Sequence, residues 1–234
     1  MEPTQCRQIR SIPRGWRRTC WRCSAAWPPA ARRRWSGCRS RRCARPTAGS
    51  ARCWAAIRWL AAHAGELGVD AGRLAVAGDS AGGSLAAVAC QQLRGGDVAL
   101  RAQLLFYPST DLSPAAREFP SRRENGAVPP LTLALMQAMS TPFVAGFDTR
   151  DPRLSPLRAA DLRGLPPALI YTADCDVLRD DGHRYAEALR AAAVAVEHVE
   201  LPGMVHGFVE MAGVLPAAVQ AIEHAGAFLR ARLA

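Results

Sequence analysis

The chain contains no lysine, and all thirty of its basic residues are arginine. Long apolar runs are missing too, because nowhere do the roughly eighteen consecutive apolar residues of a membrane-spanning helix occur. Residues 1–30 carry an arginine every few positions and have no apolar segment of the kind found in a secretory signal. These absences predict a soluble, cytoplasmic protein with reduced thiols and no membrane span.

Basic charge and cysteine are concentrated near the start of the chain. The formal net charge is +10, yet residues 1–53 hold fourteen arginines and one acidic residue, so that residues 54–234 carry −3. The same segment holds six of the eight cysteines: Cys6, Cys20, Cys23, Cys38, Cys43 and Cys53. We therefore predict an Arg/Cys-rich head at 1–53 and a single α/β domain at 54–234, which is long enough to bury a sizeable core.

In the head, apolar residues recur neither with the period of a helix nor with that of a strand. Three hypotheses account for this segment. We favour a disordered segment, or one translated out of frame from GC-rich DNA, which retranslation of the upstream nucleotides would test. The spacing Cys20-x2-Cys23 followed by Cys38-x4-Cys43 approximates a zinc ribbon. Binding of nucleic acid by a basic arm around residues 32–35 is the third hypothesis, although composition alone would produce such an arginine run.

Residues 54–234 alternate between short apolar runs and longer segments of helical period. We expect strands at 74–77, 99–107, 166–173 and 194–201. We expect helices at 54–65, 81–93, 131–139, 182–193 and 216–233. Because helices of about ten residues or more separate strands, the strands should pair in parallel. The sequence thus predicts half or more of an open α/β sheet, with the helix at 131–139 lying over a pocket and its Met136 and Met139 in ordinary packing contacts.

One motif in this pattern carries chemistry. Residues 78–83 read Gly-Asp-Ser-Ala-Gly-Gly and join an expected strand to an expected helix. Such a Gly-x-Ser-x-Gly turn is sharp, so any side chain at Gly78 or Gly82 should collide with the strand or helix, and Ser80 is held out toward a substrate. The backbone N–H of Ala81, at the helix start, should face a developing oxyanion. The motif predicts acyl transfer.

A serine hydroxyl needs a general base, and the base needs an orienting carboxylate. In open α/β sheets these groups lie where strands end. Asp174 and Asp176 follow the third expected strand, and His206 follows the fourth, so that Ser80, Asp176 and His206 stand in the order of nucleophile-elbow hydrolases. Asp174 competes with Asp176 for the acid. We expect the other aspartate next to the serine and the other histidines to be structural, surface or packing residues: Asp79, His63, His183, His198 and His224.

Residues 54–234 resemble the bacterial hormone-sensitive-lipase branch of the α/β-hydrolase superfamily. The elbow at 78–83, which includes Gly83, matches that family, as do Asp176-x-Leu178-x-Asp180-Asp181-Gly182 and His206-Gly207-Phe208. The resemblance implies an α/β-hydrolase fold and hydrolysis of a small-molecule carboxylic ester through an acyl-enzyme. Ser80 would be the nucleophile, His206 the base and then the acid, and Asp176 the group that orients the imidazole. No metal and no organic cofactor are implied.

The chain departs from the family in one respect. The family has a His-Gly-Gly-Gly stretch upstream of the elbow, together with earlier strands and cap helices, and none is recognisable here, so the sequence looks N-terminally incomplete. Ala81 would then be the sole oxyanion donor, and we expect weak or no hydrolysis. The strand at 74–77 would be an uncovered edge open to oligomerisation. An amidase or carbamate hydrolase, or an inactive homologue with a nucleic-acid-binding or zinc-binding head, remains the alternative.

Overall fold

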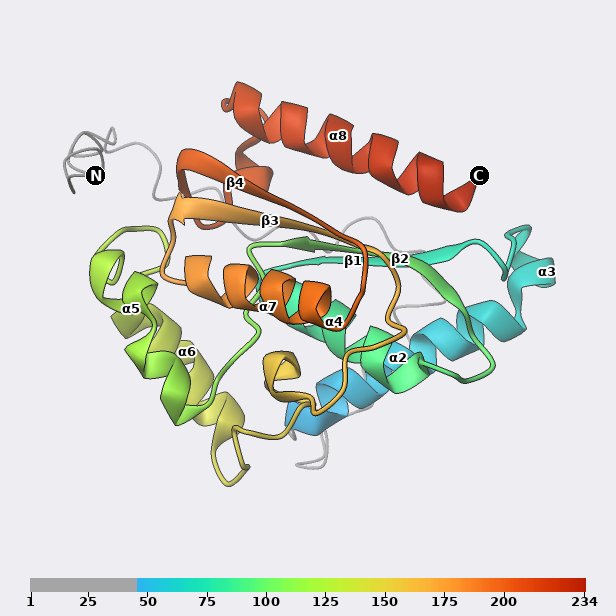
Figure 1. Ribbon diagram of the computed structural model, residues 1–234, viewed down its shortest axis with the longest axis horizontal. Coiled ribbons are helices and arrows are strands. Elements are labelled where there is room, and N and C mark those ends of the chain that lie inside the picture. The colour runs from blue at the N-terminus through green and yellow to red at the C-terminus, as the bar shows by residue number, and fades with distance from the viewer. Residues whose placement is uncertain (1–45) are drawn as a thin grey trace, which may run out of the picture. The chain divides into compact units, whose positions relative to one another are not determined.

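The computed structural model describes the backbone of residues 46–234 and the side chains of residues 52–234. The hypotheses on residues 1–45, including the zinc ribbon and the basic arm, lie outside the described residues. The described part contains one sheet of parallel strands (Figure 1). Its order is β1 (Leu74–Asp79), β2 (Leu100–Phe106), β3 (Ala168–Cys175) and β4 (Val196–Val205). The predicted parallel α/β sheet is confirmed.

Helices cover both faces of this sheet. The α-helices of the described residues are α2 (Pro46–Ala62), α3 (Ala64–Leu67), α4 (Ala81–Leu93), α5 (Pro120–Glu124), α6 (Leu133–Val144), α7 (Arg179–Ala191) and α8 (Pro216–Leu233), and the short 3-10 helices are η4 (Pro114–Glu118), η5 (Pro156–Arg158) and η6 (Phe208–Met211). Helix α8 lies over one face, and α4 and α7 lie over the other, with α2 packed against α4 (Figure 1). Each face therefore buries its own cluster of apolar side chains, one on either side of the sheet.

The expected elements differ from the observed ones mainly at their ends. The first helix begins at Pro46, before the expected start at residue 54, and proline is accepted in the first turn of a helix. Strand β4 continues to Val205, where a loop was expected from Pro202 onward. Proline is tolerated there because β4 is an edge strand and its pairing with β3 shifts register between Ala173 and Cys175.

Strand β1 forms the other edge of the sheet. Within the described residues it pairs with β2 alone, from Leu74 opposite Leu100 to Asp79 opposite Phe106. No strand of residues 46–234 lies on its outer side, and backbone groups without a neighbouring strand favour pairing with another chain. Oligomerisation through this edge stays a prediction. No helix in the described part of the chain has the length and apolar character needed to cross a membrane.

A buried ion pair fixes the long connection between β2 and β3 to helix α7. Arg122 in α5 lies 2.6 Å from the Asp181 carboxylate, and both side chains are almost fully buried. Asp181 also accepts hydrogen bonds from the backbone N–H groups of Thr110 and Asp111. A Cβ on the next residue, Gly182, would lie 2.4 Å from a methyl of Thr172. The Asp-Asp-Gly segment at 180–182 therefore anchors the connection that carries α5 and α6.

Candidate active site

Each strand of the described sheet is followed at once by a residue of one cluster. Ser80 follows β1, Tyr107 follows β2, Asp176 follows β3 and His206 follows β4. Because the strands are parallel, these four positions lie along the same edge of the sheet, where open α/β folds bind ligands. The three residues predicted from sequence are therefore brought together, and Tyr107 is added to them.

Ser80 lies on a strained turn between β1 and α4. Its φ of 53° and ψ of −120° fall outside the regions that a residue with a side chain usually adopts. The turn is fixed by hydrogen bonds on both sides, because Ser80 N–H donates to Phe106 O at 2.9 Å and Ser80 O accepts from the N–H groups of Ser84 and Ser109. The serine side chain is thus positioned by its backbone.

The glycines of the turn differ in how much space a side chain would have. A Cβ on Gly78 would lie 2.2 Å from Gly82 O, and a Cβ on Gly83 would lie 2.8 Å from the Cβ of Pro108. A Cβ on Gly82 would meet only Asp79 Oδ1, at 3.6 Å, which is ordinary van der Waals contact. The expectation that any side chain at Gly82 would collide is wrong, and the steric demand falls on Gly78 and Gly83.

Two alanine substitutions should separate these glycines. We expect Gly78→Ala to lower the free energy of unfolding by at least about 1–3 kcal/mol, because the new methyl overlaps backbone that cannot move without opening the turn. Gly82→Ala should be neutral or slightly stabilising, because alanine is the better helix former in α4. Urea denaturation of both variants measures the difference. Equal destabilisation by the two substitutions would contradict the steric account.

Ser80, His206 and Asp176 form a continuous chain of hydrogen bonds. The imidazole Nε2 of His206 lies 2.9 Å from Ser80 Oγ, and its Nδ1 lies 2.7 Å from Asp176 Oδ2. The other oxygen of Asp176 accepts from the N–H of Leu178 at 2.9 Å, and the Asp176 side chain is fully buried. This arrangement orients the imidazole with one nitrogen toward the serine hydroxyl.

The competing acid, Asp174, points to a different partner. Its Oδ2 accepts a hydrogen bond from the N–H of Gly203 at 3.3 Å, and its backbone carbonyl accepts from Asn125 Nδ2. The same Asn125 amide donates to the carbonyl of Asp176, so that this one side chain ties both residues to α5. Of the two aspartates, only Asp176 contacts His206.

The remaining histidines of the described residues make structural contacts away from Ser80. His63 stacks on Trp59, and His224 Nδ1 lies 2.6 Å from the hydroxyl of Tyr171. The Nε2 of His198 lies 2.9 Å from Thr172 Oγ1, and burial, followed by the nearby His183 and Arg190, lowers the pKa of His198 to about 4. The carboxylate of Asp79, the last residue of β1, accepts no hydrogen bond from any described residue, so a capping role for it is not found.

Tyr107 is the site residue that sequence reasoning missed. It is buried, has a φ of 36°, and donates its backbone N–H to Tyr171 O at 2.7 Å. Its ring centroid lies 4.7 Å from that of His206 and 5.2 Å from that of Phe208. The aromatic ring therefore supports one side of the imidazole. Its place directly after a buried strand and before a proline was the available sequence signal.

An apolar cavity opens beside Ser80. Its volume is about 350 Å³, and its lining includes Ala81, the first residue of α4. The other lining residues are Ser84, Leu85, Ser109, Leu112, Leu131, Met136, Met139, Ser140, Phe143, Arg153, Leu154 and Leu178. Helix α6 thus lies over a pocket as expected, but Met139 is 64% exposed on it and no residue of α6 is buried. Ordinary packing was the wrong expectation for Met139, which is exposed, whereas Met136 is partly buried, and both line this cavity.

Backbone N–H groups at the start of α4 lie directly after Ser80. The N–H groups of the first helical turn have no partner within a helix, and Ala81 begins α4 directly after Ser80. Among the described residues, no group of three or more His, Cys, Asp or Glu side chains is placed to hold a metal ion. The assignment of Ala81 as the oxyanion donor stays a prediction.

Comparison with known proteins gives consistent matches. A sequence model of the alpha/beta hydrolase fold matches residues 44–210. Carboxylesterase NlhH of Mycobacterium tuberculosis is 49% identical over 175 residues, which cover 72% of this chain and 53% of NlhH. Ethyl acetate hydrolase of Pseudomonas putida is 39% identical over 163 residues, which cover 68% of this chain and 50% of that protein. The chain spans about half the length of the curated relatives it matches.

Solved structures of esterases show the same fold. EstE1, a thermostable carboxylesterase cloned from a metagenomic library, superposes with a TM-score of 0.71 at 39% identity, covering 78% of this chain and 62% of EstE1. A thermostable esterase from Pseudomonas putida ECU1011 gives a TM-score of 0.75 at 39% identity, covering 79% of this chain and 59% of that one.

Proposed function

The chain belongs to the α/β-hydrolase family, and we propose that it hydrolyses carboxylic esters through an acyl-enzyme formed on Ser80. The observation that carries the proposal is the hydrogen-bonded chain from Ser80 Oγ through His206 to the buried Asp176, at the side of an apolar cavity. Relatives named carboxylesterase and ethyl acetate hydrolase support esters as the substrate class.

The reaction follows from the order of these three groups along the hydrogen-bonded chain. Ser80 Oγ attacks the ester carbonyl carbon while His206 Nε2 accepts the hydroxyl proton, and Asp176 stabilises the imidazolium that forms. The carbonyl electrons move to oxygen, and the N–H of Ala81 faces the oxyanion. When the carbonyl re-forms, the bond to the alcohol breaks and His206 returns the proton to the leaving oxygen. Water then repeats the sequence and releases the carboxylic acid.

The rate is expected to be low. Loss of one oxyanion donor typically costs about 10²–10³ in rate, and Ala81 is the one donor we assign among the described residues. Covalent labelling is therefore a more sensitive test of Ser80 than turnover, because each active chain needs to react only once.

A fluorophosphonate probe tests the proposal. We expect the folded chain to be labelled on the peptide that contains Ser80, as read by mass spectrometry, and the Ser80→Ala variant to remain unlabelled. Unfolded protein keeps the serine but loses the contact with His206, so it controls for non-specific reaction. Absence of label on a chain with native circular dichroism would overturn the proposal and favour an inactive homologue. Comparing p-nitrophenyl butyrate with butyryl p-nitroanilide then separates an esterase from an amidase.

A further inference from the structure

A second cavity adjoins the one beside Ser80. Its volume is about 480 Å³, and it lies between α6 and the segment that contains η4. The two cavities share Leu112, Met136 and Ser140 as wall residues, so they meet along α6. The second is the more polar of the two, because Arg117, Gln137 and several other polar side chains line it.

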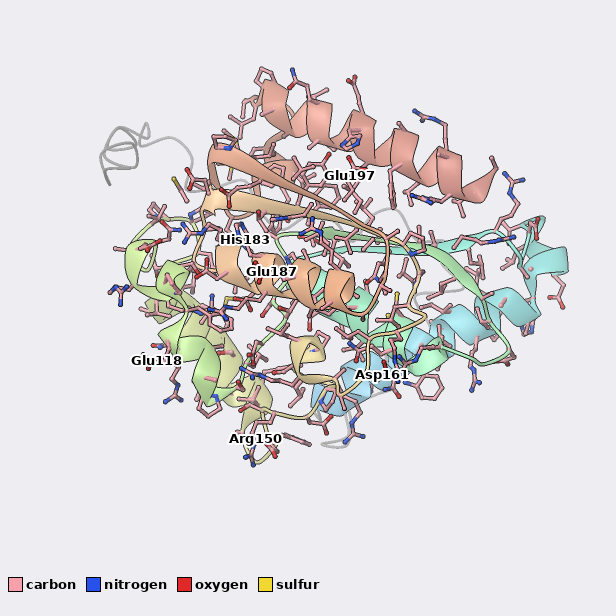
Figure 2. All side chains as sticks on the ribbon, in the orientation of Figure 1. Glu118, Arg150, Asp161, His183, Glu187 and Glu197 are labelled. Atoms are coloured by element: carbon pink, nitrogen blue, oxygen red, sulfur yellow. The ribbon has the colours of Figure 1, made fainter. Side chains whose placement is uncertain are left out.

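One charge in the second cavity is uncompensated. Asp111 lies 2.5 Å from Arg158, and Arg122 lies 2.6 Å from Asp181, so each of these charges has a partner. Arg117 is exposed and has no ion pair or hydrogen bond with any described residue. Figure 2 labels Glu118, its neighbour in η4, at the end of the molecule that carries α5 and α6. An unpaired guanidinium in a cleft recognises carboxylates and phosphates.

The position of His206 decides which part of an ester would reach this arginine. The leaving alcohol must lie next to His206 Nε2 to receive its proton, and His206 lines neither cavity. The cavity is lined by Ser80 itself and by Ala81 and Ser84 of α4. An acyl chain placed on the side of Ser80 away from His206 would therefore run along the apolar cavity and toward the second one.

From this arrangement we infer that the second cavity is a subsite for an anionic group at the far end of the acyl chain. The substrate class is a hemiester of a dicarboxylic acid, with its methylene chain against the apolar wall and its free carboxylate on Arg117. The amide of Gln137 and the hydroxyl of Thr141, which line the same cavity, supply neutral donors. This inference rests on the proposed ester hydrolysis at Ser80.

Matched pairs of substrates test the subsite. The p-nitrophenyl hemiesters of glutaric, adipic and suberic acids are compared with p-nitrophenyl valerate, hexanoate and octanoate, which have the same acyl lengths. We expect the ratio of kcat/KM for charged over neutral ester to fall about tenfold in Arg117→Gln, because a hydrogen bond to a charged group is lost. Arg123→Gln, an exposed arginine that lines neither cavity, should leave the ratio unchanged. An unchanged ratio in Arg117→Gln would overturn the inference.

A binding measurement keeps this test separate from catalysis. In Ser80→Ala, which cannot form the acyl-enzyme, monomethyl adipate should bind more tightly than methyl hexanoate by calorimetry, and Arg117→Gln should remove the difference. Binding with this preference but without Ser80 labelling would support the subsite and contradict the proposed hydrolysis. Labelling of Ser80 with no preference for the charged ligand would support hydrolysis and contradict the subsite.

Discussion

Replacing Asp176 with asparagine should slow phosphonate labelling of Ser80 by about 10⁴-fold. The buried carboxylate accepts from Nδ1 of His206 at 2.7 Å, which leaves Nε2 free to take the serine proton. An asparagine amide can donate to Nδ1 and so favour the wrong imidazole tautomer. Because the amide oxygen can still accept from Leu178 N–H, the turn should persist. The rate constant for labelling under pseudo-first-order conditions gives the ratio.

Asp174→Asn provides the matched control for this prediction. Asp174 lies two residues earlier, within β3, but its carboxylate accepts from Gly203 N–H and does not reach His206. We expect its labelling rate to stay within a few-fold of the unmodified chain. If Asp174→Asn slowed labelling as much as Asp176→Asn, the assignment of the acid would be wrong, and equal rates for Asp176→Asn and the unmodified chain would remove Asp176 from the reaction.

Much of this site could be predicted because its residues are fixed by local backbone geometry. The strand at 74–79 and the helix at 81–93 hold Ser80 between them, and each signal is contained in adjacent residues. Asp176 and His206 could be placed at the same edge because parallel strands end together. Spacing alone left Asp174 and Asp176 open, since the residues are two apart at the same strand end, and the choice of Asp176 came from the family resemblance.

The parts that could not be predicted depend on contacts between distant segments. Tyr107 gains its place from a ring contact with His206, about a hundred residues away, which no local pattern records. The steric demand on Gly83 comes from Pro108, beyond the next strand. Strand β4 passes the expected stop at Pro202 because pairing with β3 continues past it. In each of these three cases, packing between segments far apart in the sequence determined the structure, and local sequence signals did not.

Removing one member of the buried ion pair should have the largest effect on stability. We expect Arg122→Ala to lower the free energy of unfolding by about 3–5 kcal/mol near pH 8, because Asp181 is left charged and buried without its partner. The guanidinium also donates to the carbonyl of Val177, directly after Asp176, so its loss should loosen the loop that holds the acid. Arg123→Ala, its exposed neighbour in the same helix, should change stability by no more than about 0.5 kcal/mol.

The pH dependence of that loss distinguishes an unpaired charge from a simple packing defect. Burial raises the pKa of Asp181 to about 6, while Arg122 and the two backbone N–H donors oppose the rise. Without Arg122 the pKa should rise further, so that below about pH 6 the folded variant holds a neutral carboxyl that needs no counter-charge. A folded-state pKa above the unfolded value means that the folded chain binds more protons, and its stability falls as pH rises through that interval. Urea midpoints should therefore show a larger loss of stability for Arg122→Ala near pH 8 than near pH 5.

The double variant Arg122→Met, Asp181→Asn should recover part of the loss near pH 8, because it removes both charges and keeps most of the side-chain volume. A deficit independent of pH, with no recovery in the double variant, would mean that Arg122 acts through packing alone.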